Sequence, residues 1–294
     1  MDVNFELYKI FYLAAKSESF SSASRKLFIS QSAVSQSVKH LEDKLGAKLF
    51  TRKGKQMVLT NEGVLLLTHV EQAYNFIKTA EHKILEIQNM DAGEIRIGAS
   101  DTVCRYHLVP YLEKFNTLYP KIKIHVINRT SSQILNLLKN GIVDFGIVTL
   151  PVEDDDISVS EFMNVQDIFV ASDKYSDLMN ISIDLRDITC YPLLMLEKNS
   201  STRRNLDIYF RSIGVLITPE IELESVDLLV DFAKIGLGVA CVLKESAMDA
   251  LCKKEIFEVQ TKEKLPERKL GIISMKSVPL SKASTKFMEF IPNR

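Results

Sequence analysis

Residues 30–46 read SQSAVSQSVKHLEDKLG, and their pattern is the strongest structural signal in the N-terminal part of the chain. Four of its apolar residues are spaced by four, three and four, which places them on one face of an α-helix: Val34, Val38, Leu41 and Leu45. Ser30 suits an N-cap because its hydroxyl can accept a hydrogen bond from a backbone NH, and Gly46 suits a left-handed C-cap. We therefore predict one bounded helix whose apolar face packs into a core.

The opposite face of this helix carries short hydroxyls, amides and one cation: Ser32, Ser35, Gln36 and Lys39, with Gln31 at the leading edge. These groups can meet base edges and phosphates when a recognition helix enters the major groove by its N-terminal end. Taken alone, the same face is also typical of a solvated surface helix. The neighbouring segments favour DNA binding.

Two flanking segments complete the pattern of a winged helix-turn-helix. Before the helix, Phe20, Ala23 and Leu27 mark a short amphipathic helix that is only a few residues away. After it, residues 49–60, LFTRKGKQMVLT, read as a hairpin with a basic tip, whose cations would contact the sugar-phosphate backbone. The predicted DNA-binding residues are Ser30, Gln31, Ser32, Ser35, Gln36, Lys39, Arg52, Lys53 and Lys55.

On these residues the chain resembles the LysR-type transcriptional regulators. Matching elements follow one another in the family's order over about sixty residues, which is far more specific than a lone motif: Phe11 and Ala14; Ser19, Phe20, Ala23 and Leu27; residues 30–35; Leu41, Glu42, Leu45 and Gly46; Leu49, Phe50 and Arg52; Leu59, Thr60 and Gly63. Ser19, Ser24 and Ser32 stand where the family usually has Gly, Ala and often Pro, and no departure removes a DNA-contacting group. The resemblance implies binding to double-stranded DNA and control by a small-molecule effector.

Positive charge is concentrated at the N-terminal end, although the whole chain has a formal net charge of -1. Residues 1–60 hold 10 Lys and Arg against 5 Asp and Glu, and the remainder holds 27 against 33. A basic end suits the phosphate field, while an acidic remainder limits indiscriminate binding to nucleic acid. No apolar run is long and charge-free enough to span a bilayer, and the first residues, MDVNFELYK, lack a signal peptide's pattern. We expect a cytoplasmic protein without a membrane partner.

A heptad pattern covers residues 61–89. Its apolar positions recur at spacings of four and three: Leu66, Val70, Ala73, Ile77, Ala80, Ile84 and Ile87. A helix of this length, roughly 40–45 Å at 1.5 Å per residue, needs a partner along such a face. The alternative is packing on its own domain, which is too small to cover the whole face. We expect the helix to pair two subunits in a homodimer or a dimer of dimers.

Strands and helices alternate from residue 90 onward, which predicts βαβ crossovers and a buried parallel sheet. A first set has strands at 94–100, 121–127 and 144–148 and helices at 102–119 and 131–140. A second set has strands at 166–171, 193–196, 220–223 and 238–242 and helices at 201–212 and 227–234. A strand at 269–275 and a helix at 281–290 close the chain.

The predicted fold class is therefore α/β overall, with an N-terminal winged helix-turn-helix (1–60), a long linker helix (61–89) and a C-terminal effector-binding domain (90–294). The family resemblance implies that this last domain is two-lobed and similar to a periplasmic binding protein. Lobe I would then comprise residues 90–162 and 268–294, and lobe II residues 163–267. The two crossover strands are expected near residues 162–167 and 263–268.

Three hydroxyl-rich segments follow predicted strands, at residues 100–102, 130–132 and 199–202. Ligands of open α/β sheets bind beyond the carboxyl ends of strands, where helix N-termini present free NH groups. Each segment alone can be a simple N-cap, but together they indicate a cleft. The predicted effector-binding residues are Ser100, Asp101, Thr102, Thr130, Ser131, Thr149, Asn199, Ser200, Ser201, Thr202 and Ser225.

A small polar effector suits this cleft, and a small anion is the first candidate. The turn at residues 236–238 is expected opposite the hydroxyls. Arg203 and Arg204 are candidates to supply positive charge or to be surface residues of their helix, whereas Asp101 would oppose a simple anion. The family resemblance implies positions near the effector at Ser100, Thr102, Thr130, Ser200, Ser201 and Thr202.

Neither a metal nor another cofactor is expected. The cysteines Cys104, Cys190, Cys241 and Cys252 show no paired metal or redox spacing, and the five histidines are scattered. Cys104 near a helix start leaves redox sensing as a minor hypothesis. Because no phosphate loop, nucleophile elbow or His-Glu-x-x-His motif occurs, we do not expect an enzyme. The alternative function is a solute-binding or redox-sensing α/β protein whose winged helix contacts protein.

Overall fold

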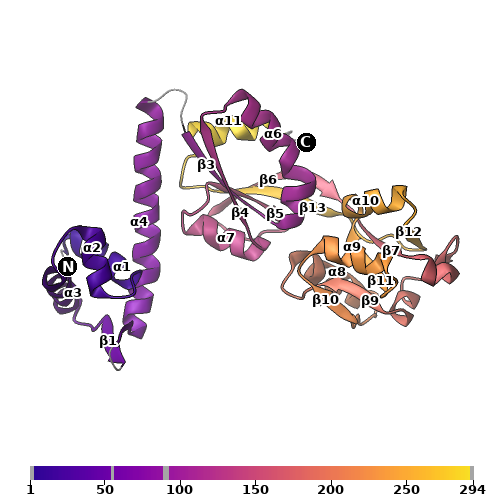
Figure 1. Cartoon of the computed structure of the whole chain (residues 1–294), viewed down its shortest axis with the longest axis horizontal. Helices are drawn as coiled ribbons and strands as arrows, with labels where there is room; N and C mark the ends of the chain where they lie inside the picture. The colour runs from indigo at the N-terminus through magenta and orange to yellow at the C-terminus, as the bar shows by residue number, and fades with distance from the viewer. Residues whose placement is uncertain (1–2, 54–55, 89–92, 292–294) are drawn as a thin grey trace. The chain divides into compact units, whose positions relative to one another are not determined.

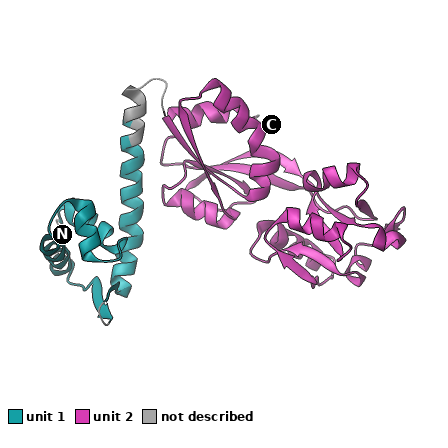
Figure 2. Cartoon of the chain, in the orientation of Figure 1, with its two compact units in different colours: residues 1–84 teal, residues 85–294 magenta. Residues whose placement is uncertain are grey.

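The computed structural model describes residues 3–53, 56–88 and 93–291 (Figure 1). The chain forms two compact units, residues 1–84 and 85–294 (Figure 2). Within the described ranges, the model contains no helix with the length and apolar character needed to cross a bilayer.

The N-terminal unit begins with three helices and a hairpin: α1 (Phe5–Ala15), α2 (Phe20–Leu27), α3 (Gln31–Leu45), β1 (Phe50–Lys53) and β2 (Gln56–Leu59). The predicted apolar face of α3 packs into the core, where Val34, Val38 and Leu41 are buried. Ser30 Oγ accepts a hydrogen bond from Ala33 N at 3.1 Å, and Gly46 has a φ of 68°. The bounded helix and the winged helix-turn-helix are therefore confirmed.

A buried carboxylate holds the wing against α3. Glu42 Oε1 accepts hydrogen bonds from the backbone NH groups of Leu49 at 2.8 Å and Phe50 at 3.2 Å, and Oε2 accepts one from Lys48 Nζ at 2.7 Å. Gly63 lies so close that an added Cβ would stand 2.1 Å from the Leu49 carbonyl oxygen. The strand entering the wing is thus fixed from two sides.

Helix α4 (Asn61–Gln88) covers the predicted heptad segment. Leu66 and Val70 pack into the core of the N-terminal unit, which corrects the expectation that the whole heptad face needs a partner. Further along, the face is open: Ala73 and Ala80 are exposed, and Ile77 and Ile84 are 41% and 57% exposed. The side chain of Ile87 lies outside the described residues.

Lobe I of the C-terminal unit is built on a five-stranded sheet of order β4-β3-β5-β13-β6. Its strands are β3 (Gly93–Ala99), β4 (Ile122–Asn128), β5 (Phe145–Thr149), β6 (Ile157–Val165) and β13 (Arg268–Met275). The first three are parallel, and β13 is antiparallel to both β5 and β6. Helices α6 (Val109–Leu118) and α11 (Lys282–Phe290) cover one face, and α7 (Ser131–Lys139) covers the other (Figure 1).

Lobe II contains a sheet of order β10-β9-β11-β7-β12-β8. Its strands are β7 (Asp167–Ala171), β8 (Ser182–Ile183), β9 (Leu193–Leu196), β10 (Ile221–Leu223), β11 (Val239–Leu243) and β12 (Phe257–Thr261). Helix α8 (Ser201–Ser212) packs on one face, and α9 (Val226–Lys234) and α10 (Lys244–Cys252) pack on the other. The chain enters lobe II between β6 and β7 and returns between β12 and β13. The two-lobed α/β fold is confirmed.

The helix predicted at 102–119 is interrupted. It consists of α5 (Asp101–Val103), a π-helical segment (Cys104–Leu108) and α6. Pro110 has no NH to donate to the carbonyl four residues earlier, and the π-helical turn accommodates this loss. The sequence interpretation expected only the end of β6, as a crossover strand near residues 162–167, and missed β8, β12 and α10. In β6 only Ile157, Phe162 and Val165 are buried, so its pattern resembles an exposed loop.

Candidate functional site

The outer face of α3 is open to solvent. Gln31, Ser32, Ser35, Gln36 and Lys39 are all exposed on it. Ser30 is also exposed, but its Oγ caps the helix and lies 2.8 Å from Ser32 Oγ. Its role in this structure is to position the start of α3.

The wing places two of its three predicted cations in solvent. Arg52 and Lys53 are exposed at the end of β1. Lys55, which was predicted to act with them, lies outside the described residues. The sequence interpretation did not single out Phe28 as a surface residue near α3. This residue ends α2 in the left-handed conformation and is 95% exposed beside the start of α3.

A bulky residue at positive φ is uncommon. The short turn between the two predicted helices was the sequence signal that a residue here adopts such a conformation.

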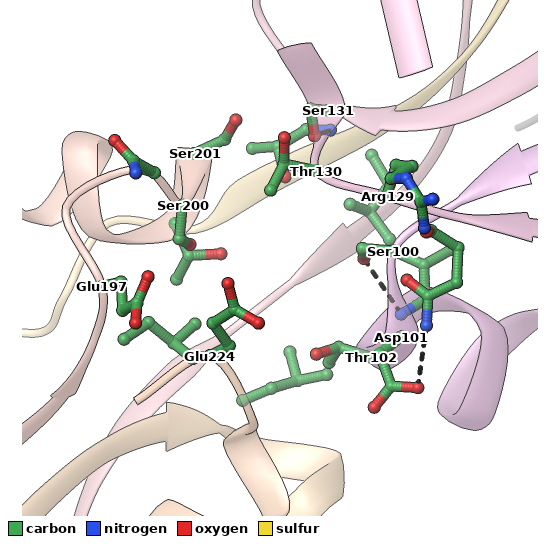
Figure 3. A pocket seen from close by; sticks show the side chains of 18 of the residues that line it. Ser100, Asp101, Thr102, Arg129, Thr130, Ser131, Glu197, Ser200, Ser201 and Glu224 are labelled. Carbon is green, nitrogen blue, oxygen red and sulfur yellow. Dashed lines mark hydrogen bonds between the residues drawn. The ribbon is translucent and has the colours of Figure 1, made fainter. Parts of the chain in front are cut away.

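A cavity of about 540 Å³ lies between the two lobes of the C-terminal unit (Figure 3). Its walls come from segments that follow β3, β4 and β5 in lobe I and β9 and β10 in lobe II. The structure brings together all eleven residues predicted for effector binding: Ser100, Asp101, Thr102, Thr130, Ser131, Thr149, Asn199, Ser200, Ser201, Thr202 and Ser225.

Several of these hydroxyls also cap helices. Ser100, Ser200 and Ser225 each accept a hydrogen bond from the backbone NH three residues later, at 3.4 Å. Ser131 Oγ accepts one from Thr149 N at 3.2 Å. Capping and lining the cavity are compatible because the first NH groups of a helix point out of its N-terminal end.

Arg203, Arg204 and the turn at residues 236–238 do not line the cavity, and Arg204 is an exposed surface residue, which is the alternative that the sequence left open. Arg203 is 1% exposed, and it donates to Asp207 at 2.8 Å and to the Leu196 carbonyl at 3.0 Å, so it ties α8 to β9. Arg204 donates to the Asn199 carbonyl and to Ser201 Oγ and does not line the cavity. The turn at residues 236–238 is also absent from the lining, because Gly236 packs against Lys174.

The sequence interpretation missed most of the charged lining. The cavity is also lined by Asn128, Arg129, Gln133, Glu197, Glu224, His107 and Arg268, with apolar contacts from Val103, Val165, Leu196, Leu243 and Leu270. Arg129, Glu197 and Glu224 each stand directly after a strand. Their position at strand ends could have indicated a role in the cavity, but the prediction of lining residues relied on the hydroxyl-rich segments beside them.

Most charges in the cavity have partners in the protein. Asn128 Nδ2 donates to Asp101 Oδ1 at 3.1 Å, and Arg129 Nη1 donates to the Asn128 carbonyl at 2.7 Å. Arg268 binds Asp167 through two hydrogen bonds, with 2.7 Å between Nη2 and Oδ1, and both residues are buried. This pair joins the two strands at which the chain passes between lobes.

His107 lines the same cavity and is 7% exposed. Burial lowers the pKa of its ring, Glu245 opposes this shift and Arg268 adds to it, so the imidazole is neutral at pH 7. Within the described part of the chain, its Nε2 has no hydrogen-bond partner.

The cysteines offer little redox chemistry. All four are free thiols. Burial, together with the nearby Asp101, raises the pKa of Cys104 to about 11, which is opposite to the shift that activates a thiol. Among the residues with described positions, no three His, Cys, Asp or Glu side chains form a group that could hold a metal ion.

A winged helix-turn-helix followed by a two-lobed domain with a cavity between the lobes defines a class of DNA-binding regulators with a ligand domain. Two family models match this chain in that order. Residues 5–64 match the bacterial regulatory helix-turn-helix protein, lysR family, and residues 88–294 match the LysR substrate binding domain. The chain belongs to the LysR family and is a DNA-binding transcriptional regulator with an effector-binding domain.

Several named transcriptional regulators are similar in sequence to this chain, and several solved structures share its fold. The HTH-type transcriptional regulator cbl of Escherichia coli is 28% identical over 250 residues, which cover 83% of this chain and 78% of cbl. The transcriptional activator CmpR of Synechocystis is 26% identical, covering 97% of this chain and 93% of CmpR. A full-length OxyR variant from Pseudomonas aeruginosa shares the fold with a TM-score of 0.72 and 20% identity, covering 99% and 95% of the two chains. CbnR complexed with its target DNA has a TM-score of 0.70 and 16% identity, covering 98% and 99%.

Proposed function

We propose that this regulator reads duplex DNA with the outer face of α3 and the wing, and that a small molecule in the cavity between its lobes controls it. One observation supports control by a ligand: residues from three separate strand ends in lobe I and two in lobe II line a single cavity. A ligand held by both lobes favours one relative arrangement of them, and this preference is what allows binding to shift a conformational equilibrium.

Direct base contacts are assigned to Gln31, Ser32, Ser35 and Gln36, because hydroxyl and amide groups on an exposed helix can donate to and accept from base edges. Lys39, Arg52, Lys53 and Lys55 are assigned to phosphates, which contribute affinity without sequence information. The exposed Phe28 is added beside the start of α3 as a contact to the backbone sugars.

The linker helix is proposed to pair two subunits. The open part of its heptad face, Ala73, Ile77, Ala80 and Ile84, is the surface for that contact. A dimer or dimer of dimers then presents two wings and two recognition helices to neighbouring half-sites. In this proposal the domains keep the boundaries 1–60, 61–89 and 90–294, and the protein acts in the cytoplasm as a regulator without catalysis.

Footprinting of the full-length protein on DNA upstream of its own gene, with competitor DNA and at two salt concentrations, tests the DNA assignment. We expect protection of a dyad-symmetric site that survives competitor and weakens with salt. Gln36→Ala and Ser35→Ala should each abolish the preference for that site while leaving the fold intact. Ser160→Ala, at an exposed position of β6 in lobe I, serves as the matched control for handling of the variants. Retained site preference in both α3 variants would show that another face reads the bases.

A further inference from the structure

Two carboxylates stand at neighbouring positions on the lobe II wall of the cavity. Strands β9 and β10 run parallel with Leu196 opposite Leu223, and Glu197 and Glu224 are the next residues on each strand. The Glu197 NH donates to the Leu223 carbonyl at 3.0 Å, so the register continues to this point. Because paired strands lie about 4.8 Å apart, the two acidic residues share one edge of the sheet, and both line the cavity (Figure 3).

Neither carboxylate forms an ion pair with a cation whose position is described, and Lys198, which directly follows Glu197, is exposed. No hydrogen bond or ion pair joins the side chain of Glu197 or Glu224 to any residue whose position is described. The nearest basic residues of α8 bind elsewhere, Arg203 to Asp207 and Arg204 to Ser201. Like charges at adjacent positions repel one another, and an opposite charge within a few ångströms relieves this. The wall therefore favours a positively charged group of a ligand.

The lobe I wall has the opposite character. Arg129 lies on it beside the N-terminal end of α7, where Thr130 and Ser131 present hydroxyls (Figure 3). The N-terminal end of α7 carries a partial positive charge, and a capping box formed by Thr130 and Gln133 satisfies only part of its first NH groups. The carboxylate on this side, Asp101, accepts the Asn128 amide. This wall suits the negative group of a ligand.

A ligand with only negative charge does not fit both walls, because Glu197 and Glu224 line the lobe II side of the cavity and the charge of Arg268 is already matched by Asp167. His107 adds a ring that is 7% exposed, and its buried Nε2 has no hydrogen-bond partner among the described residues. The cavity of about 540 Å³ lies within the range of ligand sites, roughly 300–1,000 Å³.

Building on the proposed effector role of the cavity, we propose that its ligand is a small zwitterion of the amino-acid class. Its ammonium group contacts Glu197 and Glu224, and its carboxylate faces Arg129 and the N-terminal end of α7. This assignment replaces the simple anion expected from the sequence.

Isothermal titration of the full-length protein with three matched sets of probes tests the assignment. The sets are the twenty common amino acids with glycine betaine, the carboxylic acids that lack the amine, and the amines that lack the carboxylate. We expect at least one zwitterion to bind, and its two singly charged counterparts to bind at least tenfold more weakly. Inorganic sulfate serves as an additional anion.

Variants then locate the two charges. Glu197→Gln and Glu224→Gln should each weaken binding of that zwitterion about tenfold and leave the matched carboxylic acid unchanged or tighter. Arg129→Gln should weaken the zwitterion and the carboxylic acid but not the amine. Glu220→Gln is the matched control, because this carboxylate is exposed, precedes β10 and does not line the cavity.

The proposal is overturned if sulfate or a carboxylic acid binds more tightly than every zwitterion, if no zwitterion binds, or if zwitterion binding survives both Glu→Gln substitutions. The DNA footprint, repeated with the bound probe, reports separately on the effector role. A zwitterion that binds without altering the footprint supports this assignment and contradicts the effector role. An anion that binds more tightly than every zwitterion and alters the footprint contradicts this assignment and supports the effector role.

Discussion

The Asp227 carboxylate of lobe II accepts a hydrogen bond from the Tyr106 hydroxyl of lobe I. Its other oxygen lies 2.7 Å from Arg105 Nη1. Tyr106 belongs to the π-helical segment, and Asp227 follows the cavity residue Ser225 by two positions in the first turn of α9. The two lobes thus touch directly beside the cavity. Burial, with the hydrogen bond to Asp227, raises the pKa of Tyr106, so the hydroxyl stays protonated and remains the donor.

Tyr106→Phe removes this bond between lobes. We expect the C-terminal unit to lose about 1.5–3 kcal/mol of unfolding free energy, as for a hydrogen bond to a charged group, and ligand affinity in the cavity to change because the lobes are less constrained. Urea denaturation and titration with the bound probe measure the two effects. Tyr191→Phe is the matched control, since its hydroxyl donates to Asp177 at 2.7 Å within lobe II. Equal changes in ligand affinity for both variants would contradict a role of Tyr106 between the lobes.

Glu42→Ala should destabilise the N-terminal unit. The substitution leaves the buried NH groups of Leu49 and Phe50 without their acceptor, which costs about 1–3 kcal/mol for each unsatisfied group. Because the wing is then no longer held against α3, DNA affinity should fall as well. Hydrogen exchange at these two amides in the full-length protein measures the loss directly. Unchanged protection at both amides would mean that the carboxylate does not hold the wing.

The same carboxylate predicts a dependence on pH. Burial raises the pKa of Glu42, but hydrogen bonds from Lys48, Leu49 and Phe50 outweigh it and leave the pKa below its ordinary value of 4.5. A lowered folded-state pKa stabilises the fold above the ordinary value, and that contribution disappears as the pH falls through the folded-state value. Urea midpoints at pH 6 and in steps below pH 4.5 should therefore fall less steeply in Glu42→Gln than in the native chain. If the urea midpoints of the two proteins fell equally with pH, Glu42 would not be the origin of the pH dependence.

Cys104 should react slowly with alkylating reagents. At pH 8 a thiol with a pKa of about 11 is almost entirely protonated, and the thiolate is the nucleophile. Iodoacetamide labelling followed by mass spectrometry should modify the exposed Cys190 and Cys252 well before Cys104. Rapid oxidation of Cys104 by dilute peroxide would revive the redox-sensing alternative.

The open heptad face of α4 predicts a specific loss of assembly. Ile77→Asp combined with Ile84→Asp puts two charges on that face and should convert the proposed dimer to a monomer, as measured by light scattering. Leu65→Asp is the control, because Leu65 is 64% exposed on the same helix but lies off the heptad positions. A dimer that persists in the double variant would place the subunit contact elsewhere.

Local patterns in the sequence predicted much of the fold. The bounds of α3 follow from a cap residue, a terminal glycine and a periodic apolar face, all within 17 residues. Helix α8 and strand β9 also match their predicted ranges. In contrast, β6 lies at the edge of its sheet with few buried side chains, so neither periodicity nor hydrophobicity marks it.

The amino-acid sequence was enough to predict the class of protein and the hydroxyls around the cavity, because caps, helix periods and strand ends are set by residues close together in the chain. The arrangement of charge around the cavity depends on the three-dimensional packing. Glu197 and Glu224 lie at neighbouring strand ends because β9 and β10 pair, although the two residues are 27 positions apart in sequence. Arg203 does not line the cavity because Asp207 and Glu222 bind it. Such charge pairings depend on which strands become neighbours, and the packing of the whole sheet determines that.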